Sequence, residues 1–135
     1  MTIGPKQVIV VRRDLKLKRA SIAALVAKAS AEFFLDNNES SRNDKLSVKL
    51  TPQESEWLMS GSTRIVLGVT SENALRSVLM KAEIAGLSCY PVSANSSTSR
   101  EEGDLGDIME ETLAVAIGPD DSDKIDQITG NLKLL

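Results

Sequence analysis

The sequence contains no histidine, and this absence removes several classes of catalytic and metal-binding site. A serine or cysteine nucleophile activated by histidine is excluded, and so is a zinc site of the HExxH type or any other site with imidazole ligands. A general base would have to be a carboxylate, a lysine, a tyrosine or solvent. We expect no cofactor and no bound metal, and composition alone assigns no catalytic residue.

Cysteine and long apolar runs are also scarce. The single cysteine, Cys89, cannot form an intrachain disulfide, which fits a reducing compartment. No apolar run approaches the roughly 18 residues that a membrane-spanning helix needs, and the N-terminal run QVIVV is too short for a signal peptide. We therefore expect a cytoplasmic protein without membrane contact, folded as a single domain over residues 1–135.

The formal net charge is −3, which argues against a general nucleic-acid-binding protein, but the charges are unevenly distributed. Residues 1–30 hold seven cations and one anion, whereas residues 101–126 hold ten acids and one lysine. Two interpretations follow from this distribution. The basic segment is either a solvated surface or a site for a phosphate or carboxylate.

Apolar runs that alternate with amphipathic segments predict an α/β protein whose sheet is covered on both faces. The main strands are expected at Gln7–Val11, Arg64–Val69, Leu87–Val92 and Thr112–Gly118. The alternating run KLSVKL, Lys45–Leu50, predicts a short edge strand after an exposed loop at residues 36–44. The first three main strands should run parallel through right-handed crossovers, whereas the last need not.

Capping residues predict the starts of four helices. The first is predicted to be capped by Ser21, and its apolar stripe comprises Ile22, Leu25, Val26, Ala29 and Phe33. Thr51 and Glu54 have the spacing of a capping box around Pro52. The other helices are expected to begin at Ser71, ending at Gly86, and at Pro119-Asp120-Asp121, ending at Gly130.

Ligands on such sheets bind at the carboxyl ends of strands, which directs attention to the turn after the first strand and to the loop Ser93–Ser99. The candidate anion-binding residues are Lys16, Lys18, Arg19, Ser21, Lys28, Ser96 and Thr98. The cations among them could act with the dipole of the first helix, and the hydroxyls with backbone amides. The alternatives are a solvated basic turn, an exposed Lys28 and a mobile serine-rich loop.

Three further features have two interpretations each. Cys89 lies in a predicted strand and is expected to be a buried structural thiol rather than a nucleophile. Trp57 is expected to pack in the core rather than to stack on a base. Carboxylates at Asp104, Asp107, Glu110 and Glu111 could bind a divalent cation, but they lack EF-hand spacing and fit a solvated acidic face.

Three stretches together resemble the archaeal and eukaryotic-type (type 2) peptidyl-tRNA hydrolases. They are VIVVRRDLKLKRASIAALVAKAS, GSTRIVLGVTSENALRSVLMKAEIAGL and VAIGPDDSDKIDQITGNLKLL. The resemblance covers most of the chain except residues 36–56 and 99–111. It implies a three-layer α/β/α domain with a four-stranded mixed sheet, to which KLSVKL would add a short edge strand. It also implies hydrolysis of the ester that links a peptide to tRNA.

The resemblance fails at most of the positions that it marks as functional. Where the family has lysine-glycine-lysine, this chain has Arg19-Ala20-Ser21, and the family's glutamine and histidine are replaced by Leu25 and Lys28. After the third strand, Ala94 replaces an aspartate and Ser96-Ser97 replace glycine-arginine, whereas Thr98 matches. The acidic segment that follows is longer than the family's and would repel tRNA phosphates.

We therefore consider three hypotheses. The first is a catalytically degenerate relative, from a bacterial branch, that binds a small anionic ligand or a protein partner through Arg12–Ser21 and Ser93–Ser99. The second is an active esterase with a rebuilt site that uses Thr98, Arg19, Lys28 or loop carboxylates. The third is an assembly role, in which an apolar helix surface or the Lys45–Leu50 edge forms a homo-oligomer.

Overall fold

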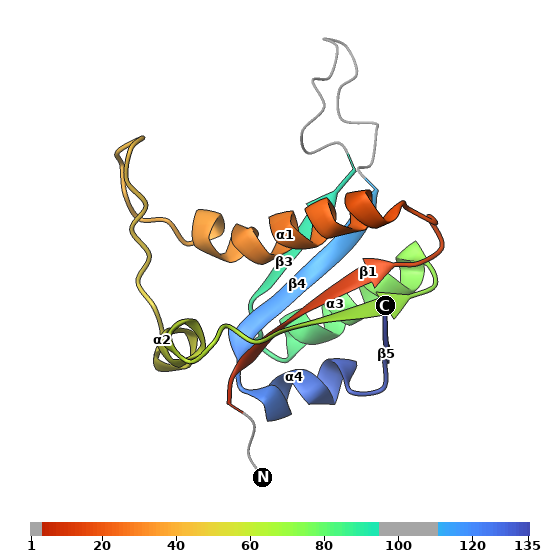
Figure 1. Ribbon diagram of the computed structural model, residues 1–135. Helices are drawn as coiled ribbons and strands as arrows, with labels where there is room; N and C mark the ends of the chain where they lie inside the picture. Colours follow the sequence, from red (N-terminus) through yellow and green to blue (C-terminus); the bar gives the residue numbers. More distant parts are fainter. Residues whose placement is uncertain (1–3, 95–110) are drawn as a thin grey trace.

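The computed structural model describes residues 4–94 and 111–135. Over these residues the chain forms five strands and four helices that alternate along most of its length (Figure 1). In chain order the elements are β1 (Lys6–Arg12), α1 (Arg19–Asp36), α2 (Pro52–Met59), β2 (Arg64–Val69), α3 (Glu72–Ile84), β3 (Cys89–Ser93), β4 (Thr112–Asp120), α4 (Ser122–Thr129) and β5 (Lys133–Leu134).

The strands form one mixed sheet in the order β3-β4-β1-β2-β5 within the described ranges. β1 and β2 are parallel, while β4 is antiparallel to both β1 and β3. β1, β2 and β3 therefore all run in the same direction, as expected, although β4 separates β3 from β1. Their carboxyl ends lie at one edge of the sheet, which we call the carboxyl edge, and β4 begins there.

Two hydrophobic cores lie on opposite faces of the sheet and confirm the three-layer α/β/α architecture. Val8 and Val10 of β1 face α3 and α4, whereas Ile9 and Val11 face α1 (Figure 1). This division follows from the alternation of side chains along a strand. Every residue of β1 is buried, which explains why the middle of this central strand, Val8–Val11, is a continuous apolar run.

The helix α2 is attached to the α1 side of the core by Trp57. The Trp57 side chain is 0% exposed, and its indole nitrogen donates a hydrogen bond to the Thr63 carbonyl at 2.8 Å. The Phe33 ring lies edge-on at 6.4 Å between centroids, and the Arg64 guanidinium lies 4.8 Å from the centre of the indole. Trp57 is thus a core residue, as predicted, and is not available to stack on a base.

Several predicted elements differ from the structure. Lys45–Leu50 does not form a strand, and only Val48 makes a bridge, with Asn38. The short edge strand is instead Lys133–Leu134, which pairs with β2. A segment with an alternating pattern becomes a strand only if an existing strand has a free edge with which it can pair. The free edge of β2 is already occupied by the C-terminal segment.

Two helix boundaries were also predicted wrongly. Ser21 does not cap α1, because the helix begins at Arg19 and its N-cap, Lys18, makes no side-chain capping bond. Pro119 and Asp120 do not open α4 but extend β4, and α4 begins at Ser122. The remaining caps were predicted correctly, at Thr51 with Glu54 and at Ser71.

Among the described residues, no helix combines the length and the apolar character that crossing a bilayer would require.

We expect the Thr51 cap to stabilise α2 measurably. The Thr51 hydroxyl accepts from the Glu54 amide at 3.2 Å, and the Glu54 carboxylate accepts from the Thr51 amide at 2.8 Å. Thr51→Ala should therefore lower the free energy of unfolding by about 1 kcal/mol in urea titrations. Thr51→Ser keeps the hydroxyl and serves as the control. Equal stabilities for the alanine variant and the wild type would contradict the assignment.

Candidate functional site

The carboxyl edge is organised around Arg12, the last residue of β1. The Arg12 side chain is only 7% exposed. Its Nε and Nη2 atoms donate to the two oxygens of Asp14 at 3.1 and 2.7 Å, a two-pronged contact. Its Nη1 lies 3.1 Å from a Glu111 carboxylate oxygen and also donates to the Thr112 carbonyl. Arg12 thus joins the turn after β1 to the start of β4.

A third acid, Glu72, lies at the same edge. One Glu72 carboxylate oxygen accepts a hydrogen bond from the Thr112 amide at 2.9 Å and lies 3.5 Å from the Arg76 guanidinium. Glu72 is the first residue of α3, so this bond fastens the helix to the beginning of β4. We call Arg12, Asp14, Glu72 and Glu111 the Arg12 cluster.

The cluster holds two of its acids, Asp14 and Glu72, in the ionised form. The hydrogen bonds from Arg12 lower the pKa of Asp14 below its ordinary value, and Asp14 in turn raises the pKa of Arg12. The hydrogen bond from the Thr112 amide, with help from Arg76, lowers the pKa of Glu72. A carboxylate with a lowered pKa is a weak base, so Asp14 and Glu72 are poorly suited to remove a proton near neutral pH.

The basic turn, residues 13–19, follows directly after the cluster. Lys16 has a left-handed backbone with φ of 51°, and its amide donates to the Arg13 carbonyl at 3.2 Å. Arg13, Lys16, Lys18 and Arg19 are all exposed. The first turn of α1 carries no acid to offset these charges, so the start of α1 favours an anion.

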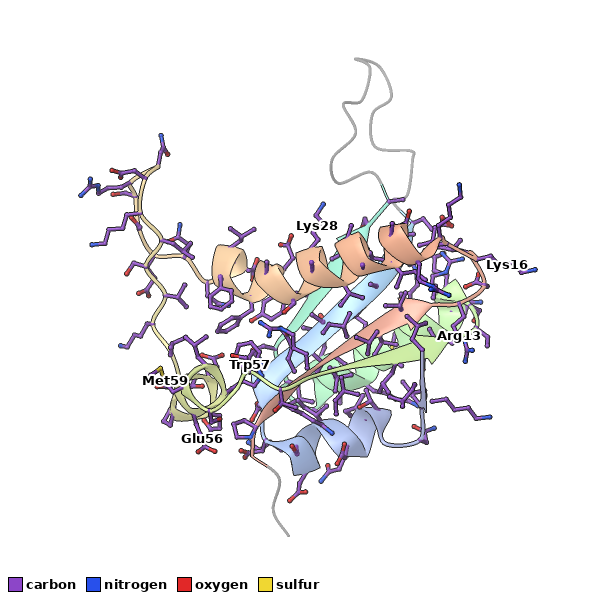
Figure 2. The ribbon with its side chains drawn as sticks, viewed as in Figure 1. Arg13, Lys16, Lys28, Glu56, Trp57 and Met59 are labelled. Atoms are coloured by element: carbon purple, nitrogen blue, oxygen red, sulfur yellow. The ribbon has the colours of Figure 1, made fainter. Side chains whose placement is uncertain are left out.

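Of the predicted anion-binding residues, those that the structure describes are not gathered into one pocket. Lys16 points away from the protein at the turn, and Lys28 leaves α1 on the side away from the sheet (Figure 2). Arg19 borders an apolar groove of about 650 Å³ between α1 and the C-terminal segment, together with Val66 and Leu135. Ser21 is exposed in the first turn of α1, where it is not a cap.

Other predicted positions lie outside the described residues. These are Ser96 and Thr98, and the acids Asp104, Asp107 and Glu110. Of the predicted acidic group, Glu111 is described, and it pairs with Arg12. Across residues 4–94 and 111–135, no group of three or more histidine, cysteine, aspartate or glutamate side chains could hold a metal ion.

Two positions at which the resemblance implies polar groups are apolar. Leu25 is buried in the core on the α1 side, beside Ala29 and Phe33. Ala94 follows β3, and its amide donates to the Glu111 carbonyl at 2.8 Å, so Ala94 is the neighbour of Glu111 across the ladder. The Arg12 cluster was not predicted from the sequence, because its members are up to 99 positions apart in the chain. A usable signal was present, since Arg12 ends an apolar run and lies two residues before Asp14.

Cys89 lies near the opposite end of β3 and is half-buried. Burial, with a contribution from Glu83, raises the pKa of its thiol to about 11. The thiol therefore stays protonated near neutral pH, in agreement with a structural rather than a nucleophilic role.

The family model and similar curated proteins agree on one family. The sequence matches the family described as peptidyl-tRNA hydrolase PTH2 over residues 5–135. The peptidyl-tRNA hydrolase of Methanocaldococcus jannaschii is 37% identical over 130 residues, covering 96% of this chain and 99% of that protein. That of Methanopyrus kandleri is also 37% identical, with 96% and 97% covered. A solved structure of a protein of unknown function from Agrobacterium tumefaciens shares the fold, with a TM-score of 0.56, 12% identity and 98% of both chains covered.

We expect Arg12→Gln to lower the urea midpoint at pH 7, because Asp14 and Glu111 lose their shared partner. The folded pKa of Asp14 lies below its unfolded value. The stabilisation is therefore complete above the ordinary carboxyl pKa of about 4 and is lost as the pH falls through the lower, folded value. The difference between wild type and variant should shrink over that range.

Arg42→Gln provides a matched control for this prediction. The Nε and Nη2 atoms of Arg42 donate to the two carboxylate oxygens of Asp44 at 3.0 and 2.8 Å, as those of Arg12 do to Asp14. Both side chains of the Arg42–Asp44 pair, however, are about two thirds exposed. Its loss should change the midpoint little, because exposed ion pairs contribute little to stability. Equal effects of the two substitutions would show that burial of Arg12 does not matter.

We also expect Cys89 to react slowly with iodoacetamide. With a thiol pKa of about 11, the thiolate fraction at pH 8 is about 100-fold below that of an ordinary cysteine. The alkylation rate, followed by mass spectrometry, should keep rising beyond pH 10, and urea-unfolded protein is the reference. A rate that levels off near pH 9 would contradict the raised pKa.

Proposed function

Because the chain belongs to the peptidyl-tRNA hydrolase PTH2 family, we propose that it uses this scaffold to bind a small anionic ligand at the carboxyl edge without hydrolysing an ester. The ligand would carry a phosphate or a carboxylate. The observation that carries the proposal is the state of Asp14 and Glu72 at that edge, which are ionised and already hydrogen-bonded.

Ester hydrolysis needs a group that removes a proton from water near neutral pH. The chain has no histidine, and the pKa values of Asp14 and Glu72 are both held below the ordinary range. Hydrogen bonds that stabilise a carboxylate also make it a weaker base. The Arg12 cluster therefore supports a structural role for these acids.

The apolar character of Leu25 and Ala94 supports the same proposal. Leu25 packs in the core and can neither donate nor accept a hydrogen bond, and a methyl group at position 94 cannot orient water. Loss of a general base typically lowers a rate by about 10² to 10⁴.

The basic turn supports the binding part of the proposal. Its cations are exposed, and the chain carries no acid between Leu15 and Ala31. A phosphate or carboxylate at the start of α1 would meet both these side chains and the unbonded amides of the first helical turn.

A second candidate function is an active peptidyl-tRNA hydrolase with a rebuilt site. The relatives of that name, at 37% identity over almost the full length, favour it. Arg19, Lys28, Thr98 or carboxylates of the acidic segment would then take over catalysis.

The test is incubation of the purified protein with N-acetyl-aminoacyl-tRNA, with the Methanocaldococcus jannaschii hydrolase as positive control. We expect release no faster than spontaneous hydrolysis, because the chain has no histidine and, in the described part of the carboxyl edge, Asp14 and Glu72 are weak bases. Turnover comparable to that of the control enzyme would refute the proposal in favour of the second candidate. In that case Arg19→Ala and Thr98→Ala should each lower the rate about tenfold, with circular dichroism confirming the fold.

A further inference from the structure

A hollow of about 380 Å³ lies where β2 ends, between the basic turn, the start of α3 and the segment that leads into β5. Its lining contains two cations, Arg13 and Lys133, and no acid. Thr70 and Asn131 add a hydroxyl and a side-chain amide. This composition contrasts with the protein as a whole, whose formal net charge is −3.

Backbone geometry places Lys133 beside the aliphatic stem of Arg13. Lys133 of β5 lies directly opposite Gly68 of β2 in the antiparallel ladder, so both residues face the same side of the sheet. The stem of Arg13 crosses that same point. A Cβ atom on Gly68 would lie 2.5 Å from Arg13 Cδ and 2.8 Å from Cγ.

Gly68 therefore has a specific role, which is to leave room for the Arg13 side chain against the backbone of β2. The main chain of Arg13 is fixed as well, because its amide donates to the Val69 carbonyl at 2.7 Å. Arg13 consequently remains at the end of β2, beside the C-terminal strand (Figure 2).

The charges of this pair are not balanced by the surrounding residues. In the described part of the chain, neither the Arg13 nor the Lys133 side chain forms an ion pair, whereas the neighbouring Arg12 is satisfied by Asp14 and Glu111. Both cations therefore line the hollow without an acid to offset them, and a bound anion would supply the missing opposite charge. A guanidinium fork also matches the oxygens of a phosphate.

We propose that this hollow binds the dianionic phosphate group of a small phosphate monoester. Arg13 and Lys133 provide the charge, while the Thr70 hydroxyl and the Asn131 amide donate hydrogen bonds. The inference rests on the proposed function, because it names the anion and moves its site from the start of α1 to the end of β2. A dianion is favoured over a phosphodiester because two cations face an acid-free cavity.

The experiment is a titration of ¹⁵N-labelled protein with inorganic phosphate, adenosine monophosphate and dimethyl phosphate at constant ionic strength. We expect saturable shifts of the Thr70, Asn131 and Lys133 amides with the first two, and weaker binding of the monoanionic diester. Arg13→Gln and Lys133→Gln should each weaken binding about fivefold or more. Lys49→Gln, which removes one charge from an exposed loop position, should leave the affinity unchanged.

Gly68→Ala tests the geometry without removing a charge. Its methyl group must displace the Arg13 stem, so binding should weaken while the rest of the spectrum confirms the fold. Shifts confined to Lys16–Ser21 and insensitive to Arg13→Gln would overturn this inference and leave the proposed function standing. The absence of saturable shifts anywhere would overturn both. Equal weakening by Lys49→Gln, or equally tight binding of dimethyl phosphate, would overturn the assignment of a dianion site.

Discussion

The fold depends on how the central strand buries polar groups at both of its ends. At the carboxyl edge, the Arg12 guanidinium is buried and must be paired, because an unpaired buried charge is strongly destabilising. At the other end, Lys6 is buried and contacts Asp126 at 2.6 Å, while Gln7 exchanges hydrogen bonds with Ser30 of α1. A shift of β1 by one residue would leave these groups without partners, so they fix its register as firmly as the apolar residues between them.

The same pairing separates two adjacent arginines into different roles. The Arg12 side chain is buried and its charge is paired with carboxylates, whereas the side chain of the next residue, Arg13, is exposed. Side chains alternate along extended backbone, so neighbouring residues of like charge reach opposite environments. Asp14 loses basicity because it is bonded to the buried arginine, whereas the exposed Arg13 keeps its charge available. Charge pairing at this edge thus favours binding over proton transfer.

Local signals in the sequence predicted most of the fold. The capping box at Thr51, the cap at Ser71 and the strand Arg64–Val69 are encoded by residues close to one another, and all were predicted correctly. Errors arose where distant residues decide. Lys45–Leu50 has a strand pattern but no partner, and Lys133–Leu134 is a strand only because β2 offers a free edge. The pairing of Arg12 with Glu111 likewise depends on the fold that brings β1 and β4 together.

The environment of Trp57 makes this protein well suited to optical measurement. It is the only tryptophan in the chain, it is fully buried, and it connects α2 to Phe33 of α1 and to Thr63 before β2. A buried indole emits at shorter wavelength than a solvated one, so detachment of this one helix and loss of the whole fold both shift the emission. Comparing that signal with far-ultraviolet ellipticity separates local release of the helix from global unfolding.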